Sequence, residues 1–140
     1  MPEGGASLLE ETAVSEHPNI LLLHKVYARD RDTFFRMVTP AYVCHTPGCS
    51  PVAGHVVGAE GMRGHIEHGQ ALSGGTFRVS HQGAFLADDH WGLVPVRLSG
   101  QREGRTLDMQ AFGVWRFEAG LIAEHWENPL DIAAFDAFWS

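Results

Sequence analysis

Apolar residues in the first half of the chain recur three or four positions apart, which is the spacing of one buried helix face. This pattern predicts three helices. The first opens at His17-Pro18, the second runs from an N-cap at Asp32 to a stop at Pro40, and the third covers residues 59–72. Between the last two, residues 41–46 are predicted as a strand and residues 55–57 as a short extended segment.

The spacing changes to every second residue after the turn at residues 73–75, and this is the period of a β-strand. The tail over residues 130–139 returns to helical spacing. The fold class is therefore α+β, with helices on one face of a curved antiparallel sheet that encloses a cone-shaped pocket. Four strands are predicted in this sheet, joined by hairpin turns: residues 76–87, 90–99, 106–118 and 121–127.

Size and charge narrow the classes of partner. A chain of 140 residues and 15.4 kDa suits a single domain. Its net charge of −7, from 17 acidic and 10 basic residues, argues against nucleic acid and anionic membranes as partners. Residues 1–16 contain glutamates and no basic residue, so they are predicted to form a loose acidic arm before a domain over residues 17–140.

The sequence also bears on location. The sequence does not show the basic N-terminal segment followed by an apolar stretch that is typical of a secretory signal peptide. No apolar run approaches the roughly 18 residues of a membrane span. Two cysteines, Cys44 and Cys49, cannot build a disulfide framework. A cytoplasmic location is therefore expected.

The composition is unusual in its nine histidines, each able to transfer a proton or bind a metal. Cys44, His45 and Cys49 offer only one pair of cysteines, and a strand points Cys44 and His45 to opposite faces, so no metal site is expected there. His65 and His68 lie three apart on a predicted helix, without an HExxH motif. A solvated helix face accounts for this pair, while His65 is kept as a candidate at the pocket mouth.

Several motifs together resemble one known superfamily. They are residues 28–32 (ARDRD), residues 43–48 (VCHTPG), residues 58–61 (GAEG), residues 75–77 (GTF) and residues 115–126 (WRFEAGLIAEHW). The chain resembles the nuclear transport factor 2-like superfamily, which includes ketosteroid isomerase, scytalone dehydratase, limonene epoxide hydrolase and the SnoaL-type polyketide cyclases. The last motif is most similar to the SnoaL-like branch. The resemblance implies a cone-shaped fold and leaves the reaction open, because this fold hosts many functions.

The resemblance to ketosteroid isomerase, residue by residue, implies His45 at the position of the general-base aspartate. The protonated aspartate of the isomerase corresponds to Gly113, and its oxyanion tyrosine to Leu22 or Leu23. Tyr27 lies too far along the helix to replace that tyrosine. The oxyanion pair is thus missing, and steroid isomerisation is not expected.

Other branches imply other candidates. SnoaL-type cyclases use a late acidic residue as base, for which Asp131 is the nearest match. Scytalone dehydratase relies on pocket histidines, which agrees with a role for His45. An imidazole has a pKa suited to proton transfer near neutral pH. The alternative for His45 is a structural hydrogen bond to the adjacent turn.

Glu124 completes the predicted catalytic set. On a regular strand Ile122, Glu124 and Trp126 share a face, which should be buried, and desolvation would then raise the Glu124 pKa. Glu124 would act as a general acid or orient His45, and a structural pairing with an arginine is the alternative. The opposite face, toward solvent or a dimer partner, would hold His125 and Glu127.

Aromatic and apolar side chains are predicted to shape the pocket. They favour a flat or polycyclic apolar ligand over a sugar or a phosphate. The alternative is that they only pack in the hydrophobic core, as most such residues do. The predicted substrate-binding residues are Met109, Trp115, Phe117, Trp126, Trp91 and His65.

Three functions follow from these observations. The first is a cofactor-independent SnoaL-like enzyme (cyclase, dehydratase or isomerase) that acts by general acid–base chemistry on an apolar carbonyl compound in bacterial secondary metabolism. His45, Glu124 and Asp131 would be its catalytic residues, with no cofactor or metal. The second is a non-catalytic module that binds a hydrophobic ligand or a protein through the same cone.

The third is an epoxide hydrolase, which needs an Asp-Arg-Asp arrangement. Arg97, Asp108 and Arg116 are present, but strand parity turns Asp108 and Arg116 away from the pocket. The convex face of the sheet would carry Phe112 and Val114, and a homodimer through that face is expected.

Overall fold

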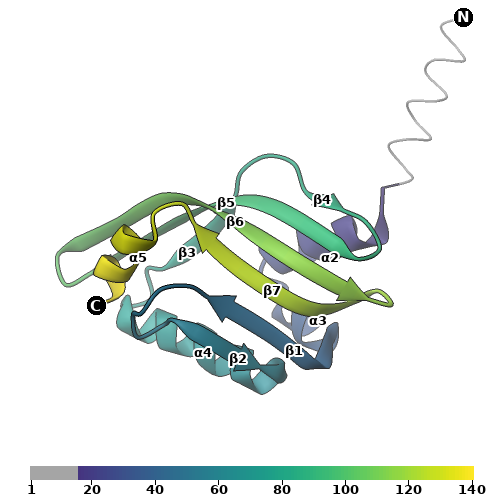
Figure 1. Cartoon of the computed structure of the whole chain (residues 1–140), viewed down its shortest axis with the longest axis horizontal. Helices are drawn as coiled ribbons and strands as arrows, with labels where there is room; N and C mark the ends of the chain where they lie inside the picture. Colours follow the sequence, from purple (N-terminus) through teal and green to yellow (C-terminus); the bar gives the residue numbers. More distant parts are fainter. Residues whose placement is uncertain (1–15) are drawn as a thin grey trace, which may run out of the picture.

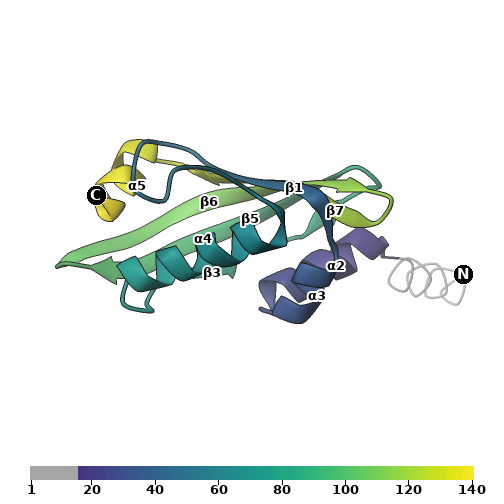
Figure 2. The same cartoon turned by 90° about the horizontal axis from the view of Figure 1, so that it is seen from below.

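One curved sheet of seven strands forms the body of the molecule (Figure 1), and α4 and the α2–α3 pair lie on the same side of it (Figure 2). The strand order is β2-β1-β7-β6-β5-β3, with β4 beside β5. The computed structural model describes residues 16–140, so the acidic arm predicted over residues 1–16 lies, apart from Glu16, outside the described residues. In chain order the elements are α2 (Pro18–Tyr27), α3 (Arg31–Arg36), β1 (Val38–Thr46), β2 (Gly54–Val57), α4 (Gly58–Leu72), β3 (Arg78–His81), β4 (Leu86–Ala87), β5 (Trp91–Arg102), β6 (Arg105–Glu118), β7 (Leu121–Pro129) and α5 (Ile132–Trp139). The predicted α+β class is confirmed.

The second helix differs from its prediction at both ends. Its N-cap is Asp30 rather than Asp32, because the Asp30 carboxylate accepts the backbone N–H of Thr33 at 3.0 Å. It ends at Arg36, and Val38 begins strand β1. The reason is long-range pairing: Val38 lies opposite Ile122 in a parallel ladder, which overrides the local helical spacing.

The two long hairpins agree with the sequence. In each turn both central residues have positive φ, namely Glu103 and Gly104 between β5 and β6, and Ala119 and Gly120 between β6 and β7. Two-residue turns of this kind match the twist of the strands that they join. The predicted strand over residues 76–87 is instead divided into β3 and β4, with a loop between them.

Strand β7 contains one irregularity that decides which residues face inward. Ile122 lies opposite Phe117 on β6, but Glu124 lies opposite Arg116, so Ala123 is an extra residue in β7. Such a β-bulge shifts the alternation of side chains by one position. Beyond Ala123, every residue of β7 therefore faces the side opposite to the one that regular alternation predicts.

The core lies between the inner face of the sheet and the helices. Side chains such as Leu23, Val94 and Phe117 are almost completely buried there, and each contributes roughly 1.5–3 kcal/mol through removal of apolar surface from water. Helix α5 covers one end of the sheet with Phe138 and Trp139. Among residues 16–140, no helix is long and apolar enough to cross a membrane.

Candidate active site

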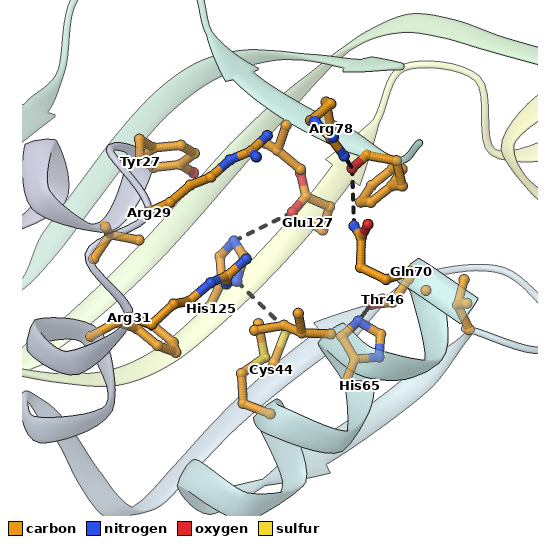
Figure 3. A pocket seen from close by; sticks show the side chains of 18 of the residues that line it. Tyr27, Arg29, Arg31, Cys44, Thr46, His65, Gln70, Arg78, His125 and Glu127 are labelled. Atoms are coloured by element: carbon orange, nitrogen blue, oxygen red, sulfur yellow. Dashed lines mark hydrogen bonds and ion pairs between the residues drawn. The ribbon is translucent and has the colours of Figure 1, made fainter. Parts of the chain in front are cut away.

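The inner face of the sheet and the helices enclose a cavity of about 420 Å³. Its floor is formed by β1, β6 and β7, and its walls by α2, α4 and α5. Apolar side chains such as Phe34 and Ile66 line much of it, and a small number of polar groups converge from the strands. Figure 3 shows these polar side chains pointing into one space. This composition is typical of a small-molecule site.

His125 and Glu127 enter the cavity from β7. The prediction that they face away from the pocket, and that Glu124 and Trp126 face it, is wrong because the bulge at Ala123 reverses the alternation. Pairing with β6 shows the same arrangement, since His125 lies opposite the inward-facing Trp115. The sequence contains no local signal for this extra residue.

His45 also lies on the face away from the cavity. Strand β1 runs parallel to β7, with Cys44 opposite His125 and His45 opposite Trp126. Cys44 therefore lines the cavity and His45 does not. The expectation that Cys44 and His45 point to opposite faces is confirmed, but the expectation that His45 points into the cavity is wrong.

The imidazole of His125 is held on three sides. Its ring stacks on the indole of Trp115, with centroids 3.7 Å apart and planes within 9°. Nδ1 faces the Cys44 sulfur at 3.5 Å, and Nε2 lies 3.7 Å from Oε2 of Glu127. Burial lowers the His125 pKa to about 3, helped by repulsion from His65 and His45. His125 is therefore a neutral imidazole at pH 7.

Glu127 has the opposite shift. Burial raises its pKa to about 7, and only 16% of its side chain is exposed. Among the described residues, Oε1 of Glu127 and Nε2 of His125 have no hydrogen-bond partner. Unpaired polar atoms of this kind are uncommon in buried positions, and both belong to residues that line the cavity.

Tyr27 adds a hydrogen-bond donor beside this pair. Its hydroxyl oxygen accepts the indole N–H of Trp115 at 3.1 Å, which leaves the hydroxyl proton free to donate. A side chain at Gly113 would overlap this hydroxyl and come within 3.6 Å of His125 Nε2, so the glycine makes room for the tyrosine. Burial and then the charge of Glu127 raise the Tyr27 pKa well above its usual value, so the phenol stays protonated. Tyr27 thus lies beside His125 in the cavity, although its position in the sequence was interpreted as too far along the helix for a role there.

Cys44 and His65 complete the polar wall. Burial raises the pKa of the Cys44 thiol to about 12, so it is a neutral thiol rather than a nucleophilic thiolate. His65 on α4 lies 3.4 Å from the Thr46 hydroxyl, and burial lowers its pKa. Within residues 16–140, no three His, Cys, Asp or Glu side chains gather closely enough to hold a metal ion.

A family model for the SnoaL-like domain matches residues 22–125, most of the chain. The chain belongs to the SnoaL-like domain family. The predicted nuclear transport factor 2-like superfamily is thereby confirmed. A search of curated proteins found no match.

Solved structures share the fold of this SnoaL-like domain. Bal32a, from a soil-derived mobile gene cassette, is 27% identical with a TM-score of 0.81, over 88% of this chain and 97% of that one. An NTF2-like protein from Burkholderia pseudomallei is 17% identical with a TM-score of 0.76, over 89% and 99% of the two chains. A protein from Jannaschia, described as a SnoaL-like polyketide cyclase, is 16% identical with a TM-score of 0.66, over 88% and 92%.

On the outer face of this SnoaL-like domain, His45 and Glu124 do meet. His45 Nε2 lies 2.5 Å from Glu124 Oε2, and Arg116 Nε donates to Glu124 Oε1 at 3.0 Å. The Glu124 pKa is not raised as predicted: burial favours a rise, but the hydrogen bonds from His45 and Arg116 outweigh it and lower the pKa. The His45 ring also stacks on Trp126.

The other predicted residues of the SnoaL-like domain are dispersed. Asp131 is exposed and caps α5, accepting the Ala134 N–H at 2.9 Å. Trp115 and His65 line the cavity, whereas Met109 and Phe117 pack into the core and Trp91 is half exposed.

The arrangement considered for an epoxide hydrolase lies outside the cavity. Arg97 pairs with Asp108 at 2.5 Å, both exposed. The predicted outward orientation of Asp108 and Arg116 is confirmed by their absence from the residues that line the cavity.

Proposed function

We propose that this SnoaL-like domain is a cofactor-independent enzyme that removes a proton from the carbon next to the carbonyl group of an apolar small molecule. One observation carries the proposal: His125 and Glu127 lie side by side in the cavity with opposite pKa shifts and unpaired atoms. Neighbouring titratable groups whose environments separate their pKa values are typical of acid–base sites.

Glu127 is the proposed general base. A carboxylate with a pKa of about 7 is a stronger base than an ordinary glutamate and is still partly ionised at neutral pH. Its Oε1 has no hydrogen-bond partner among the described residues, and we assign to this atom the proton taken from substrate carbon. The resulting carboxylic acid can return the proton to another atom of the same intermediate.

Tyr27 and His125 are the proposed partners of the substrate oxygen. Removal of the proton leaves negative charge on the carbonyl oxygen, which preorganised donors stabilise in a site with little water. The Tyr27 hydroxyl keeps its proton, and it cannot donate this proton to the Trp115 indole, whose N–H is itself a donor. The proton is therefore available to the substrate oxygen. Since His125 Nδ1 faces Cys44, Nε2 is the ring atom that meets the substrate.

The apolar walls support a substrate with a ring system rather than a sugar. The Jannaschia neighbour, described as a SnoaL-like polyketide cyclase, is consistent with a polyketide-like carbonyl compound. Cyclisation, dehydration and isomerisation can each begin with this proton removal, and Glu127 serves all three. A place in bacterial secondary metabolism is part of the proposal.

The test follows hydrogen exchange at carbon. β-Tetralone, a bicyclic ketone with acidic C–H bonds beside its carbonyl, is incubated with the full chain in D2O, and NMR measures deuterium incorporation. We expect Glu127→Gln to lower the protein-catalysed rate by roughly 100-fold or more, the usual contribution of general-base catalysis. Glu124→Gln is the matched control, because it changes the same residue type on the outer face of the same strand.

The catalytic role predicted for His45 stays a prediction, and His45→Gln tests it in the same assay. Loss of exchange in His45→Gln or Glu124→Gln, with Glu127→Gln unaffected, would contradict our assignment. A wild-type rate equal to the buffer rate, with binding of the ketone seen by tryptophan fluorescence, would instead favour the non-catalytic ligand-binding module.

A further inference from the structure

Two arginines line the cavity where α2 meets α3: Arg29 lies between the two helices, and Arg31 is the first residue of α3. Within the described part of the chain, neither forms an ion pair with a carboxylate. Asp30 stands between them in sequence, but its carboxylate already accepts hydrogen bonds from the Thr33 backbone and hydroxyl, at 3.0 and 2.7 Å. The fold therefore leaves two exposed positive charges without a carboxylate partner at the edge of the cavity.

Arg29 occupies a backbone position that favours glycine. Helix α2 ends in a Schellman motif: the Asp30 N–H donates to the Lys25 carbonyl and the Arg29 N–H to the Val26 carbonyl, both at 3.1 Å. Arg29, the residue after the C-cap of this helix, has a φ of 64°. Glycine adopts this conformation freely, whereas a residue with a side chain is strained in it. Strain of this kind is common where a side chain serves a function.

The two guanidinium groups also lie close enough to repel each other. Burial lowers the Arg31 pKa, and the charge of Arg29 lowers it further. Figure 3 shows both side chains extending over the cavity, toward Glu127 and His125. Neither guanidinium reaches ion-pair distance of Glu127. Both side chains are exposed, so water screens most of this repulsion, and an anion between them would be attracted by both charges.

We propose that Arg29 and Arg31 bind an anionic group of the substrate, so that the substrate is an amphipathic organic acid. This inference rests on the proposed function and names its substrate class. Planar guanidinium groups suit a carboxylate, which they can bind with two parallel hydrogen bonds. The deeper carboxylate of Glu127 repels a second anion, so the acid group stays at the arginines while the apolar carbonyl part enters the cavity.

The test compares two fluorescent probes that differ by one charged group. Anilinonaphthalene sulfonate is an apolar ring system with an anionic group, and phenylnaphthylamine is nearly the same ring system without it. We expect the wild-type protein to bind the sulfonate more tightly at low salt, and added salt to remove this preference. The dissociation constants are measured by fluorescence titration of the full chain.

The variants are Arg29→Gly and Arg31→Gln. Each is expected to weaken binding of the sulfonate by roughly fivefold or more, with the uncharged probe unchanged. Arg29→Gly also relieves the strained backbone, so its melting temperature should equal or exceed that of the wild type. Arg36→Gln is the matched control, because Arg36 lies on α3 but does not line the cavity.

Three results would overturn the proposal. They are equal weakening of both probes in the arginine variants, absence of sulfonate binding, and a sulfonate preference that survives when Ile66→Trp fills the cavity. Neither probe undergoes proton transfer, so this test is independent of catalysis. If the probe test fails while hydrogen exchange still depends on Glu127, only the proposed substrate class is wrong. If the exchange assay fails, the proposed function itself is wrong.

Discussion

At the scale of residues, the cavity stabilises a neutral pair. Burial disfavours charge on both His125 and Glu127, so the histidine gives up its proton and the glutamate tends to keep one. Nε2 of His125 and Oε2 of Glu127 lie 3.7 Å apart, which is too far for a hydrogen bond between them. Near neutral pH this pair holds one exchangeable proton, on the carboxyl group of Glu127.

This pair makes a specific prediction about stability. Between pH 4.5 and 6.5 the unfolded chain protonates His125 and ionises Glu127, whereas the folded chain does the reverse. A lowered histidine pKa makes stability fall as pH drops below 6.5, and a raised glutamate pKa makes stability fall as pH rises above 4.5. The two slopes therefore cancel in this range.

Glu127→Gln should remove the pH dependence of stability that Glu127 contributes and leave the pH dependence that His125 contributes. Its free energy of unfolding is expected to rise with pH about 1.4 kcal/mol per pH unit more steeply than that of the wild type between pH 4.5 and 6.5. Urea denaturation across this range measures the difference. Glu124→Gln is the control and should keep the wild-type slope in the upper part of this range, because hydrogen bonds lower the Glu124 pKa from its ordinary value and the group is ionised there in both the folded and the unfolded chain. Parallel curves for Glu127→Gln and wild type would contradict the opposite shifts.

At the scale of elements, local signals predict what local physics determines. The Glu103-Gly104 and Ala119-Gly120 turns, and the helix that begins at Pro18, depend on residues that are neighbours in sequence. The orientation of β7 does not, because the extra residue at Ala123 is defined only by pairing with β6. The alternation of residues in the sequence therefore predicted the cavity and the inward orientation of Trp115, but it assigned the wrong face of β7 to the cavity. Tyr27 was missed for a related reason: its fit beside Gly113 is a contact across 86 positions of the chain.

Helix α5 allows a test of Asp131. Because its carboxylate caps the helix, Asp131→Ala is expected to cost about 1 kcal/mol of stability, while Asp131→Asn retains the cap and most of the stability. Chemical denaturation measures both. Neither variant should change the rate of exchange at carbon, since Asp131 lies outside the cavity. Loss of exchange in both variants, with the stability of Asp131→Asn preserved, would support the catalytic role predicted from the sequence.

At the scale of the whole molecule, the outer face of the sheet bears directly on assembly. Trp91 is half exposed there, and its ring lies 5.9 Å from that of Trp126. Phe112 and Val114 follow on β6, on the side away from the core. An apolar surface of this kind is typical of an interface between protein chains.

We expect the chain to form a homodimer through this outer face. Light scattering at micromolar concentration should give twice the 15.4 kDa of one chain. Val114→Arg places a charge on the outer face and should shift the mass toward that of the monomer. Val79→Arg, on the cavity side, is the matched control and should leave the mass unchanged. A monomeric wild-type mass would contradict the expectation.

The extra residue in β7 has a consequence for the comparison of relatives. The strand carries a histidine or a carboxylate on each face, with Glu124 meeting His45 on one side and His125 meeting Glu127 on the other. A relative that lacks the counterpart of Ala123 must have its alignment gap placed there, or every later position is assigned to the wrong face. Insertion or deletion of a single codon can thus exchange the titratable groups inside this cone without altering any of the side chains on the strand.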